Sequence, residues 1–402
     1  MQTFTGLQYL KIDIASNFGL DKLDWDQRIN WVDQNHANLE SLLSEAETPA
    51  LYHAGVQALR KTEAGQPTGY PISLDAASSG LQLLAVLVGC EASAKLCGVV
   101  STGHREDAYK TIYNAMRETM DSNSGVISRE DCKRAIMTSL YSSKAVPKEV
   151  FGEGALLETF FHTMEVMSPG AWNLNHALQT LWQPYALSHD WVLPDNFHVH
   201  IKNMSTKTEH VQFLNTPVGI TLKVNQGTKE GRSISPNIIH SVDAMIVREM
   251  HRRCSYDAEQ MMNVIQLLDG VKQNQGGLST EREKDQLLLT LVQHHQDCNF
   301  LSARVLDLID EHNINLVNPR ALYSLVTSLP DKAFPVISIH DAFRVHPNYG
   351  NDIRRQYNRI LYEISRSDLL SYIASQICGG HLPVNKLGDI SEQILEADYA
   401  LS

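Results

Sequence analysis

The chain has 402 residues, of which 43% are hydrophobic, and its formal net charge is -12 at pH 7. A hydrophobic content of this size can bury a large core, so the composition excludes a disordered or fibrous protein and predicts two or three subdomains. The acidic balance excludes a protein that binds nucleic acid with its whole surface, although it allows a local basic channel.

Two further features concern the cellular compartment. The six cysteines are scattered and include no Cys-x-x-Cys pair, which indicates a reducing compartment and argues against a zinc site. The longest mainly apolar run, from Leu81 to Cys90, is too short to span a bilayer, and the first residues show no signal pattern. We therefore expect a cytoplasmic protein without a membrane partner.

The first informative stretch is a strand that ends in an acid. Residues 1–65 read as helices with polar connections, and the mainly apolar run after Gly69 then leads into Asp75, with small residues following as far as Gly80. A carboxylate at the end of an apolar strand is costly unless water or a cation solvates it. An Asp at such a place is more often a turn former or a helix N-cap than a metal ligand, so Asp75 alone does not indicate a site.

The second informative stretch is a helix with a defined start. Ser128 followed by Asp131 is a helix-start signature. At about 100° per residue, Arg129, Lys133 and Tyr141 fall within about a third of the helix circumference. A triphosphate could lie along this face. The two cations would neutralise phosphate charge, and the Tyr141 ring would close the end of the site at which the base lies. The alternative is an exposed basic helix with Tyr141 in the core.

The middle of the chain predicts hairpins and further helices. His198 to Thr228 is β-rich and basic and looks like hairpins, and Pro236 to Asp243 opens another helix. From about residue 256 to 328 the chain is polar and helical, and it contains no residue pattern that indicates chemistry.

A second strand that ends in an acid runs from Phe334 into Asp341. If this strand lies beside the first one in one sheet, Asp75 and Asp341 converge. A pair of carboxylates with positions left for water and phosphate is what Mg²⁺ prefers, and it is the layout of two-metal phosphoryl transfer. If the two strands are neighbours, Asp75 and Asp341 are therefore a candidate Mg²⁺ site.

These stretches, in this order, resemble motifs of the single-subunit DNA-dependent RNA polymerases of phages and mitochondria. The matching elements are Asp75 to Gln82 for motif A, Arg129-x3-Lys133-x7-Tyr141 for motif B, Ile339-His340-Asp341 for motif C, and the intervening Pro236-Asn237-x-x-His240-Ser241-x-Asp243. The likeness covers most of the chain apart from roughly residues 250 to 330.

The resemblance implies a role for each matching position. The implied catalytic residues are Asp75, Asp341, Lys133, Tyr141 and His240, with Asp75 and Asp341 as the ligands of two Mg²⁺ ions. The implied substrate-binding residues are Arg129, Lys133, Tyr141, Gly80, Lys22 and Tyr109. The cations would hold the incoming triphosphate, Tyr141 would sit against the nascent base pair, His240 would face the minor groove near the primer end, and Tyr109 would touch the template. The implied reaction is in-line attack of an RNA 3′-oxygen on the α-phosphate.

Position 80 bears on the choice between RNA and DNA synthesis. Related DNA polymerases carry Glu five positions after the motif A Asp, where it blocks a ribose 2′-hydroxyl, and here that position is Gly80. Likewise Ala342 follows Asp341, where the DNA enzymes usually have Glu. The resemblance thus implies ribonucleotide substrates. One departure is Ser142, because the family usually has Gly directly after the motif B Tyr.

The resemblance also implies a right-hand fold of the α+β class, mainly helical, without an N-terminal promoter domain. The palm, built around an antiparallel sheet, would comprise residues 1–103, which include a helical palm insertion, and residues 240–402. The second part would contain a helical insertion at about 256–328 and a C-terminal foot. Residues 104–239 would form the fingers.

Family members are considerably longer and carry an upstream Gly-Arg motif. We therefore expect a second polypeptide that supplies this motif and the N-terminal part, as in a split, heteromeric phage polymerase, and an accessory factor for promoter opening. The other expected partners are a DNA template, the RNA product and ribonucleoside triphosphates. The alternatives are a DNA polymerase of the related family, a non-catalytic palm that binds an RNA·DNA hybrid, and a metal-dependent phosphohydrolase with the same carboxylates.

Overall fold

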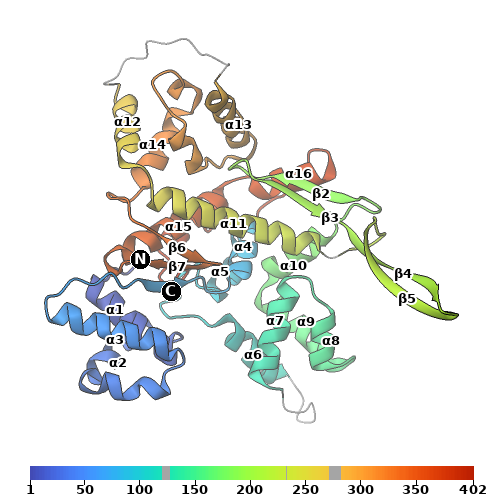
Figure 1. The fold of residues 1–402 in the computed structure, drawn as a ribbon, viewed down its shortest axis with the longest axis horizontal. Coiled ribbons are helices and arrows are strands. Elements are labelled where there is room, and N and C mark those ends of the chain that lie inside the picture. The colour runs from blue at the N-terminus through green and yellow to red at the C-terminus, as the bar shows by residue number, and fades with distance from the viewer. Residues whose placement is uncertain (120–126, 232, 271–281) are drawn as a thin grey trace.

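The computed structural model describes residues 1–119, 127–231, 233–270 and 282–402. In these ranges helices predominate, and the strands form one three-stranded and two two-stranded antiparallel sheets (Figure 1). The predicted α+β, mainly helical class is confirmed. No helix in the described ranges is long and apolar enough to cross a membrane.

The first 65 residues form a helical unit with its own apolar core. The unit comprises α1 (Gly6–Ala15), η1 (Ser16–Leu20), α2 (Trp25–Gln34), η2 (His36–Glu45) and α3 (Pro49–Glu63). Helix α1 begins at Thr5, whose hydroxyl accepts from the Gln8 N–H while the Gln8 side chain accepts from the Thr5 N–H. Between α1 and α2, Gly19 has a φ of 113°, a conformation that glycine adopts without strain. This turn determines where the following Lys22 lies.

The central sheet joins two segments that are far apart in the chain. Its strands are β1 (Ile72–Asp75), β7 (Ala342–Val345) and β6 (Ile337–Ile339), in the order β1-β7-β6. Asp75 is the register partner of Ala342, and Leu74 is the partner of Phe343. Because side chains alternate along a strand, the buried Leu74 and Phe343 share one face of the sheet, and Asp75 points to the opposite face.

The main core of the molecule packs against the buried face of this sheet. Helices that contribute to this core include α4 (Ser79–Val88), α5 (Glu91–Leu96), α11 (Ile234–Cys254), η5 (Pro347–Tyr349), α15 (Gly350–Arg366), α16 (Leu369–Cys378) and α17 (Ser391–Leu395). Tyr357 of α15 donates to Gln82 of α4 (2.7 Å), and its ring centroid lies 6.1 Å from that of Phe343. These contacts fix α4, and therefore the segment that follows Asp75, against the sheet.

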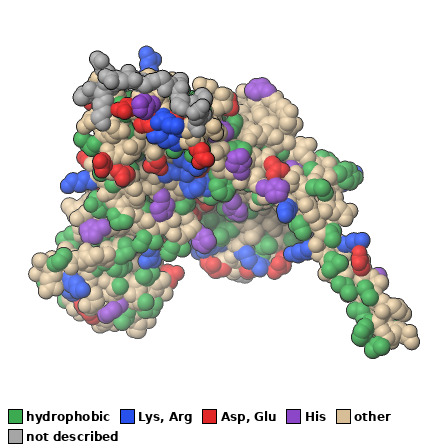
Figure 2. Space-filling view, turned by 45° about the horizontal axis from the view of Figure 1, so that its top comes forward, with side chains coloured by type: hydrophobic (Ala, Val, Ile, Leu, Met, Phe, Trp, Pro, Cys, Tyr) green, Lys and Arg blue, Asp and Glu red, His purple; other side chains and the backbone are tan. Residues whose placement is uncertain are grey.

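A second helical group lies next to α4 and is followed by the predicted hairpins. The helices are α6 (Ala108–Thr119), α7 (Arg129–Leu140), α8 (Ala145–Phe151), α9 (Ala155–Met167) and α10 (Pro169–Gln179), and the strands are β2 (Ser188–Val192), β3 (His198–Lys202), β4 (Met204–Phe213) and β5 (Thr216–Asn225). Hairpin β4–β5 projects from the body, with exposed hydrophobic side chains such as Phe213 and Leu214 (Figure 2).

The segment after α11 forms a separate helical group with its own apolar core. Its elements are α12 (Ala258–Leu268), α13 (Glu283–Cys298), η3 (Ala303–Asp307), η4 (Ile314–Leu316) and α14 (Pro319–Ser328). The helical character predicted for about 256–328 is therefore present, and residues 271–281 of that stretch lie outside the described ranges.

Candidate active site

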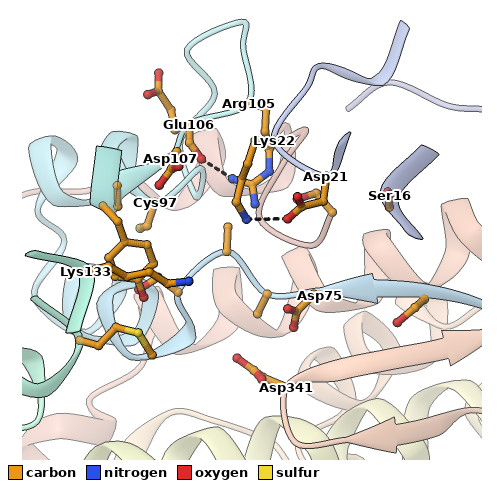
Figure 3. A pocket seen from close by; sticks show the side chains of 18 of the residues that line it. Ser16, Asp21, Lys22, Asp75, Cys97, Arg105, Glu106, Asp107, Lys133 and Asp341 are labelled. Carbon is orange, nitrogen blue, oxygen red and sulfur yellow. Dashed lines mark hydrogen bonds and ion pairs between the residues drawn. The ribbon is translucent and has the colours of Figure 1, made fainter. Parts of the chain in front are cut away.

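The turn between β6 and β7 brings the second acid beside the first. Strand β1 ends at Asp75, and the turn holds Asp341 after His340, whose φ is 56°. The Ala76 N–H donates to the carbonyl of Asp341 (3.4 Å). Asp75 and Asp341 therefore lie at the same end of the sheet, and both line one cavity of about 450 Å³ (Figure 3).

The electrostatics of this acid pair suit a divalent cation. Burial raises the pKa of Asp75 to about 6, and the negative charge of Asp341 adds to the effect, because two close carboxylates disfavour each other's ionised form. The described ranges contain no cluster of three or more His, Cys, Asp or Glu side chains that could hold a metal ion. A Mg²⁺ ion at Asp75 and Asp341 would take its other ligands from water and phosphate, as it commonly does. The two carboxylates fit such an ion.

Basic residues reach the same cavity from other elements. Lys22, from the turn before α2, and Lys133, one turn into α7, both line it. Lys22 pairs with Asp21 (2.6 Å), and the Lys133 ammonium lies 6.0 Å from the centroid of the Tyr109 ring. The cavity therefore has carboxylates on the sheet, and both cations and further acids such as Asp21 and Asp107 on the elements around it.

The start of α7 determines which of its side chains face the cavity. The Ser128 hydroxyl accepts from the Asp131 N–H (3.0 Å), as the helix-start signature predicts. Arg129, at the first helical position, donates to Asp107 (2.7 Å) just before α6, and Asp107 lines the cavity. Arg129 is therefore held at the border of the site by an acid, and Lys133 follows one turn later.

At the other end of α7, Tyr141 lies against two further predicted residues. A Cβ atom on Gly80 would lie 2.6 Å from the Tyr141 hydroxyl, so a larger side chain there would displace the tyrosine. The ring centroids of Tyr141 and His240, a residue of α11, are 4.7 Å apart. Burial raises the pKa of Tyr141 to about 12 and lowers the pKa of His240, so both rings are neutral at pH 7.

The structure brings five of the predicted site residues to one cavity. Tyr109 donates to the hydroxyl of Ser78 (3.1 Å) and also lines the cavity. The predicted residues that line the cavity are Asp75, Asp341, Lys22, Lys133 and Tyr109. Arg129 borders the cavity through its bond to Asp107, whereas Gly80, Tyr141 and His240 contact one another at the other end of α7.

Other charged residues of the site received no role from the sequence. Asp107 accepts from the Lys110 N–H (3.1 Å) at the start of α6, so its only sequence signal was a helix-capping position. Arg105 lies in an irregular segment that lines the cavity, where periodicity gives no signal. Asp243 of α11 also received no role from the sequence. Burial raises its pKa to about 6, and the negative charge of Asp341 adds to this effect.

Ser142 occupies the position where the resemblance leads us to expect glycine. Its φ is 66°, in the left-handed region that costs a non-glycine residue about 1–2 kcal/mol. The Ser142 hydroxyl donates to the side-chain oxygen of Asn175 (2.8 Å), and Asn175 donates to the carbonyl of Ser139 (2.8 Å). The backbone conformation expected of glycine is therefore kept, and the hydroxyl is anchored by a buried hydrogen bond.

Comparison with known proteins relates the N-terminal part of the chain to polymerases. Residues 2–181 match the family model of the DNA-dependent RNA polymerases. A DNA-directed RNA polymerase of Pseudomonas phage phiKMV is 29% identical over 133 residues, which cover 29% of this chain and 16% of the relative. A probable DNA-directed RNA polymerase of Neurospora crassa is 29% identical over 158 residues, which cover 34% of this chain and 18% of the relative. A probable DNA-directed RNA polymerase of Podospora anserina is 35% identical over 97 residues, which cover 21% of this chain and 10% of the relative.

The match covers only part of the site and a small part of the relatives. The chain aligns with less than a fifth of the length of each of these relatives. The matched residues include Asp75 and the whole of α7, whereas His240 and Asp341 lie beyond them and join the site through the sheet and through α11. Residues 2–181 are therefore similar to the DNA-dependent RNA polymerase family.

Proposed function

We propose that this chain is the catalytic part of a DNA-directed RNA polymerase, which joins ribonucleotides to an RNA 3′ end on a DNA template. The observation that carries the proposal is the position of Asp75 and Asp341 at one end of a sheet, in a cavity that Lys22 and Lys133 also line. The family match supports it, because the matched residues contain Asp75 and Lys133.

The chemistry follows from what these side chains would hold. Asp75 and Asp341 would hold two Mg²⁺ ions, which when bound supply positive charge at the α-phosphate and the attacking oxygen. The bond between the RNA 3′-oxygen and the α-phosphorus forms, the bond from that phosphorus to the oxygen bridging to the β-phosphate breaks, and pyrophosphate leaves with the electron pair. The proton of the 3′-hydroxyl passes to solvent.

The basic residues neutralise the triphosphate in this scheme. Lys22 and Lys133 already line the cavity, and Arg129 would exchange its ion pair with Asp107 for a phosphate oxygen. Arg suits this role because its planar fork of donors binds a phosphate through two hydrogen bonds.

The remaining predicted residues would align the nucleic acid. Tyr141, whose ring lies next to that of His240, would lie against the nascent base pair, and His240 would face the minor groove near the primer end. Tyr109 would contact the template. Gly80 carries no side chain that would exclude a ribose 2′-hydroxyl, which favours RNA over DNA synthesis.

The same proposal assigns parts of the fold. Residues 1–103 and 240–402 would form the palm around the central sheet, with the helical group after α11 as its insertion, and residues 104–239 would form the fingers. The curated relatives are much longer than the segments they share with this chain. We propose that the chain acts together with a second polypeptide that carries a Gly-Arg motif and with an accessory factor that opens the promoter.

The test is Mg²⁺-dependent extension of an RNA primer on a DNA template. Tagged protein would be purified from the cells that naturally make it, so that partner chains copurify. Wild type would be compared with Asp341→Asn and with Asp331→Asn, an exposed acid outside the cavity. Because metal stabilisation of the transition state contributes several kcal/mol, we expect Asp341→Asn to lose about 1,000-fold in rate and Asp331→Asn to match wild type.

Three readouts separate the alternatives. Loss of extension with unchanged affinity for the primer–template hybrid supports the polymerase assignment. Preference for deoxyribonucleotides in the wild type would make the protein a DNA polymerase instead. Binding of the hybrid by a wild type that never extends it would contradict catalysis and leave a hybrid-binding protein.

A further inference from the structure

Arg105 is a cation of the cavity with unused hydrogen-bonding capacity. It lies between α5 and α6, where its backbone N–H donates to Asp24 (2.6 Å) and its guanidinium donates to the carbonyl of Glu106. The Nε atom of Arg105 is buried and has no hydrogen-bond partner in the part of the chain that the structure describes. Most buried polar groups are paired, so this donor is an exception at the wall of the cavity.

The acids around Arg105 are engaged elsewhere. Asp21 pairs with Lys22 (2.6 Å) and Asp107 pairs with Arg129 (2.7 Å). Burial lowers the pKa of Arg105, and the charges of Asp21, Asp107 and Asp75 oppose this effect through space. No carboxylate of the described ranges forms an ion pair with the Arg105 guanidinium. A partly buried cation without an ion-pair partner is costly, and a bound anion would offset that cost.

The position of Arg105 relative to the other cations indicates which kind of anion would bind there. Lys22 and Arg105 both act electrostatically on Asp75, lowering its pKa against the larger effect of burial, and Figure 3 shows their side chains on the same side of the cavity. Lys133 lines the cavity from α7. Cations from three separate elements thus surround a space that begins at the acid pair, and a polyphosphate that extends away from the acids would meet them.

We propose that Arg105, together with Lys22, binds the β- and γ-phosphates of the incoming nucleotide and holds pyrophosphate as it leaves. This inference rests on the proposed function, and it adds a substrate-binding residue that the sequence pattern did not indicate. The oxygen that bridges the α- and β-phosphates gains negative charge as its bond to the α-phosphorus breaks. A guanidinium with free donors at the β-phosphate stabilises that charge.

The competing explanation is that Arg105 only holds its own loop in place. Its guanidinium bond to the Glu106 carbonyl is a structural contact, and its loss would lower stability without a selective effect on phosphate binding. The two explanations differ in what they predict for pyrophosphate, which contacts the proposed site without any base pair or template.

The experiment compares Arg105→Ala and Arg105→Lys with Arg134→Ala. Arg134 lies on α7 next to Lys133, is exposed and pairs with Glu149 (3.0 Å), so its removal changes the charge equally outside the cavity. The measurements are the KM for ribonucleoside triphosphates, inhibition by inorganic pyrophosphate, and the affinity for the primer–template hybrid without nucleotide. We expect Arg105→Ala to weaken nucleotide and pyrophosphate binding by about 10- to 100-fold and to leave hybrid affinity unchanged.

Arg105→Lys should retain part of the binding, because a lysine keeps the charge but not the bidentate fork, and Arg134→Ala should match wild type. If Lys22 and Arg105 hold the same phosphates, the effects of Lys22→Ala and Arg105→Ala should be non-additive. Pyrophosphate binding to a folded Arg105→Ala or Arg105→Lys protein equal to wild type would overturn the inference. Calorimetry of pyrophosphate with Mg²⁺ needs no catalysis, so the inference is tested even if the wild type fails to extend a primer, the result that overturns the proposed function.

Discussion

Position 80 determines how closely Tyr141 can approach α4. The Gly80 backbone has a helical conformation that alanine also adopts, so only the space around it is limiting. The atom nearest to a Cβ at this position is the Tyr141 hydroxyl, and Tyr141 is only half-buried. The ring can therefore move away at a small cost to the fold, and it would then leave its place beside His240.

We predict that Gly80→Ala raises the KM for ribonucleotides by about 10-fold and changes the free energy of unfolding by less than about 1 kcal/mol, since overpacking at a yielding side chain costs less than in a rigid core. Gly69→Ala is the matched control, because a Cβ atom there would meet nothing within 4 Å. Steady-state kinetics and urea unfolding measure the two effects. An unchanged KM would mean that the position of Tyr141 does not matter for nucleotide binding.

The residues that could be predicted are those whose role is indicated by the local sequence pattern alone. Asp75 and Asp341 end apolar strands, and Lys133 lies one turn after a capped helix start. The sequence also contained Arg105, but nothing in its neighbours distinguishes it, because its segment is held by a hydrogen bond to Asp24, which lies 81 residues earlier. The left-handed backbone of Ser142 was equally hidden, since it is fixed by a hydrogen bond to Asn175.

At the scale of elements, the last turns of α11 anchor the helical group that follows it. Glu249 is fully buried and accepts hydrogen bonds from Arg252 (3.1 Å) and Arg253 (3.2 Å) of its own helix. It also accepts from the Ser302 hydroxyl and the Ala303 N–H, which begin η3. One carboxylate therefore joins α11, which carries His240 at its other end, to the separate core of residues 258–328.

Replacing this carboxylate should destabilise the protein strongly. We predict that Glu249→Ala lowers the free energy of unfolding by about 3 kcal/mol, because it removes a partner from the buried Arg253. Glu259→Ala on the exposed face of α12 should change it by less than about 0.5 kcal/mol. Urea denaturation of the two variants measures these free energies of unfolding, and equal midpoints would show that the buried network contributes little to stability.

The sequence predicted elements better than their contacts. The hairpins after residue 198 and the helices of the segment from 258 to 328 follow from alternation and from helical periodicity. The network around Glu249 could not be predicted, because it joins side chains more than 50 residues apart, and no local pattern encodes that distance.

For the whole molecule, the raised carboxyl pKa values make stability depend on pH. Burial is the main cause for Asp13, Asp75 and Asp243, each of which has a pKa of about 6. Since the folded state binds these protons more tightly than the unfolded chain does, their contribution to stability is complete below about pH 4 and is lost as the pH rises through 6. Histidines with lowered pKa values act in the opposite sense below about pH 6.5, namely His189, His240, His251, His294 and His295.

The buried carboxyl groups and the histidines change stability in opposite directions with pH. The informative quantity is therefore the difference in stability between the wild type and a variant of one such group. We predict that Asp75→Asn and wild type have similar thermal stability near pH 4, and that without divalent ions the variant becomes the more stable of the two as the pH rises towards 7. Mg²⁺ should then raise the stability of wild type at pH 7 and not that of Asp75→Asn. Thermal unfolding with a chelator or with Mg²⁺ measures this, and a constant difference from pH 4 to 7 would contradict the raised pKa.

The arrangement of the central sheet has a consequence for the time at which the site can form during synthesis. Gln82 of α4 donates to the carbonyl of Ala400, 318 residues later, and Ala76 forms a bridge with Leu401. At a synthesis rate of about 5–20 residues per second, these partners emerge roughly 15–60 s after α4 does. During that interval α4, which is buried along its whole length in the folded protein, can pack against α5 and α10 but lacks these later partners, so the site should be completed only after synthesis has passed residue 400.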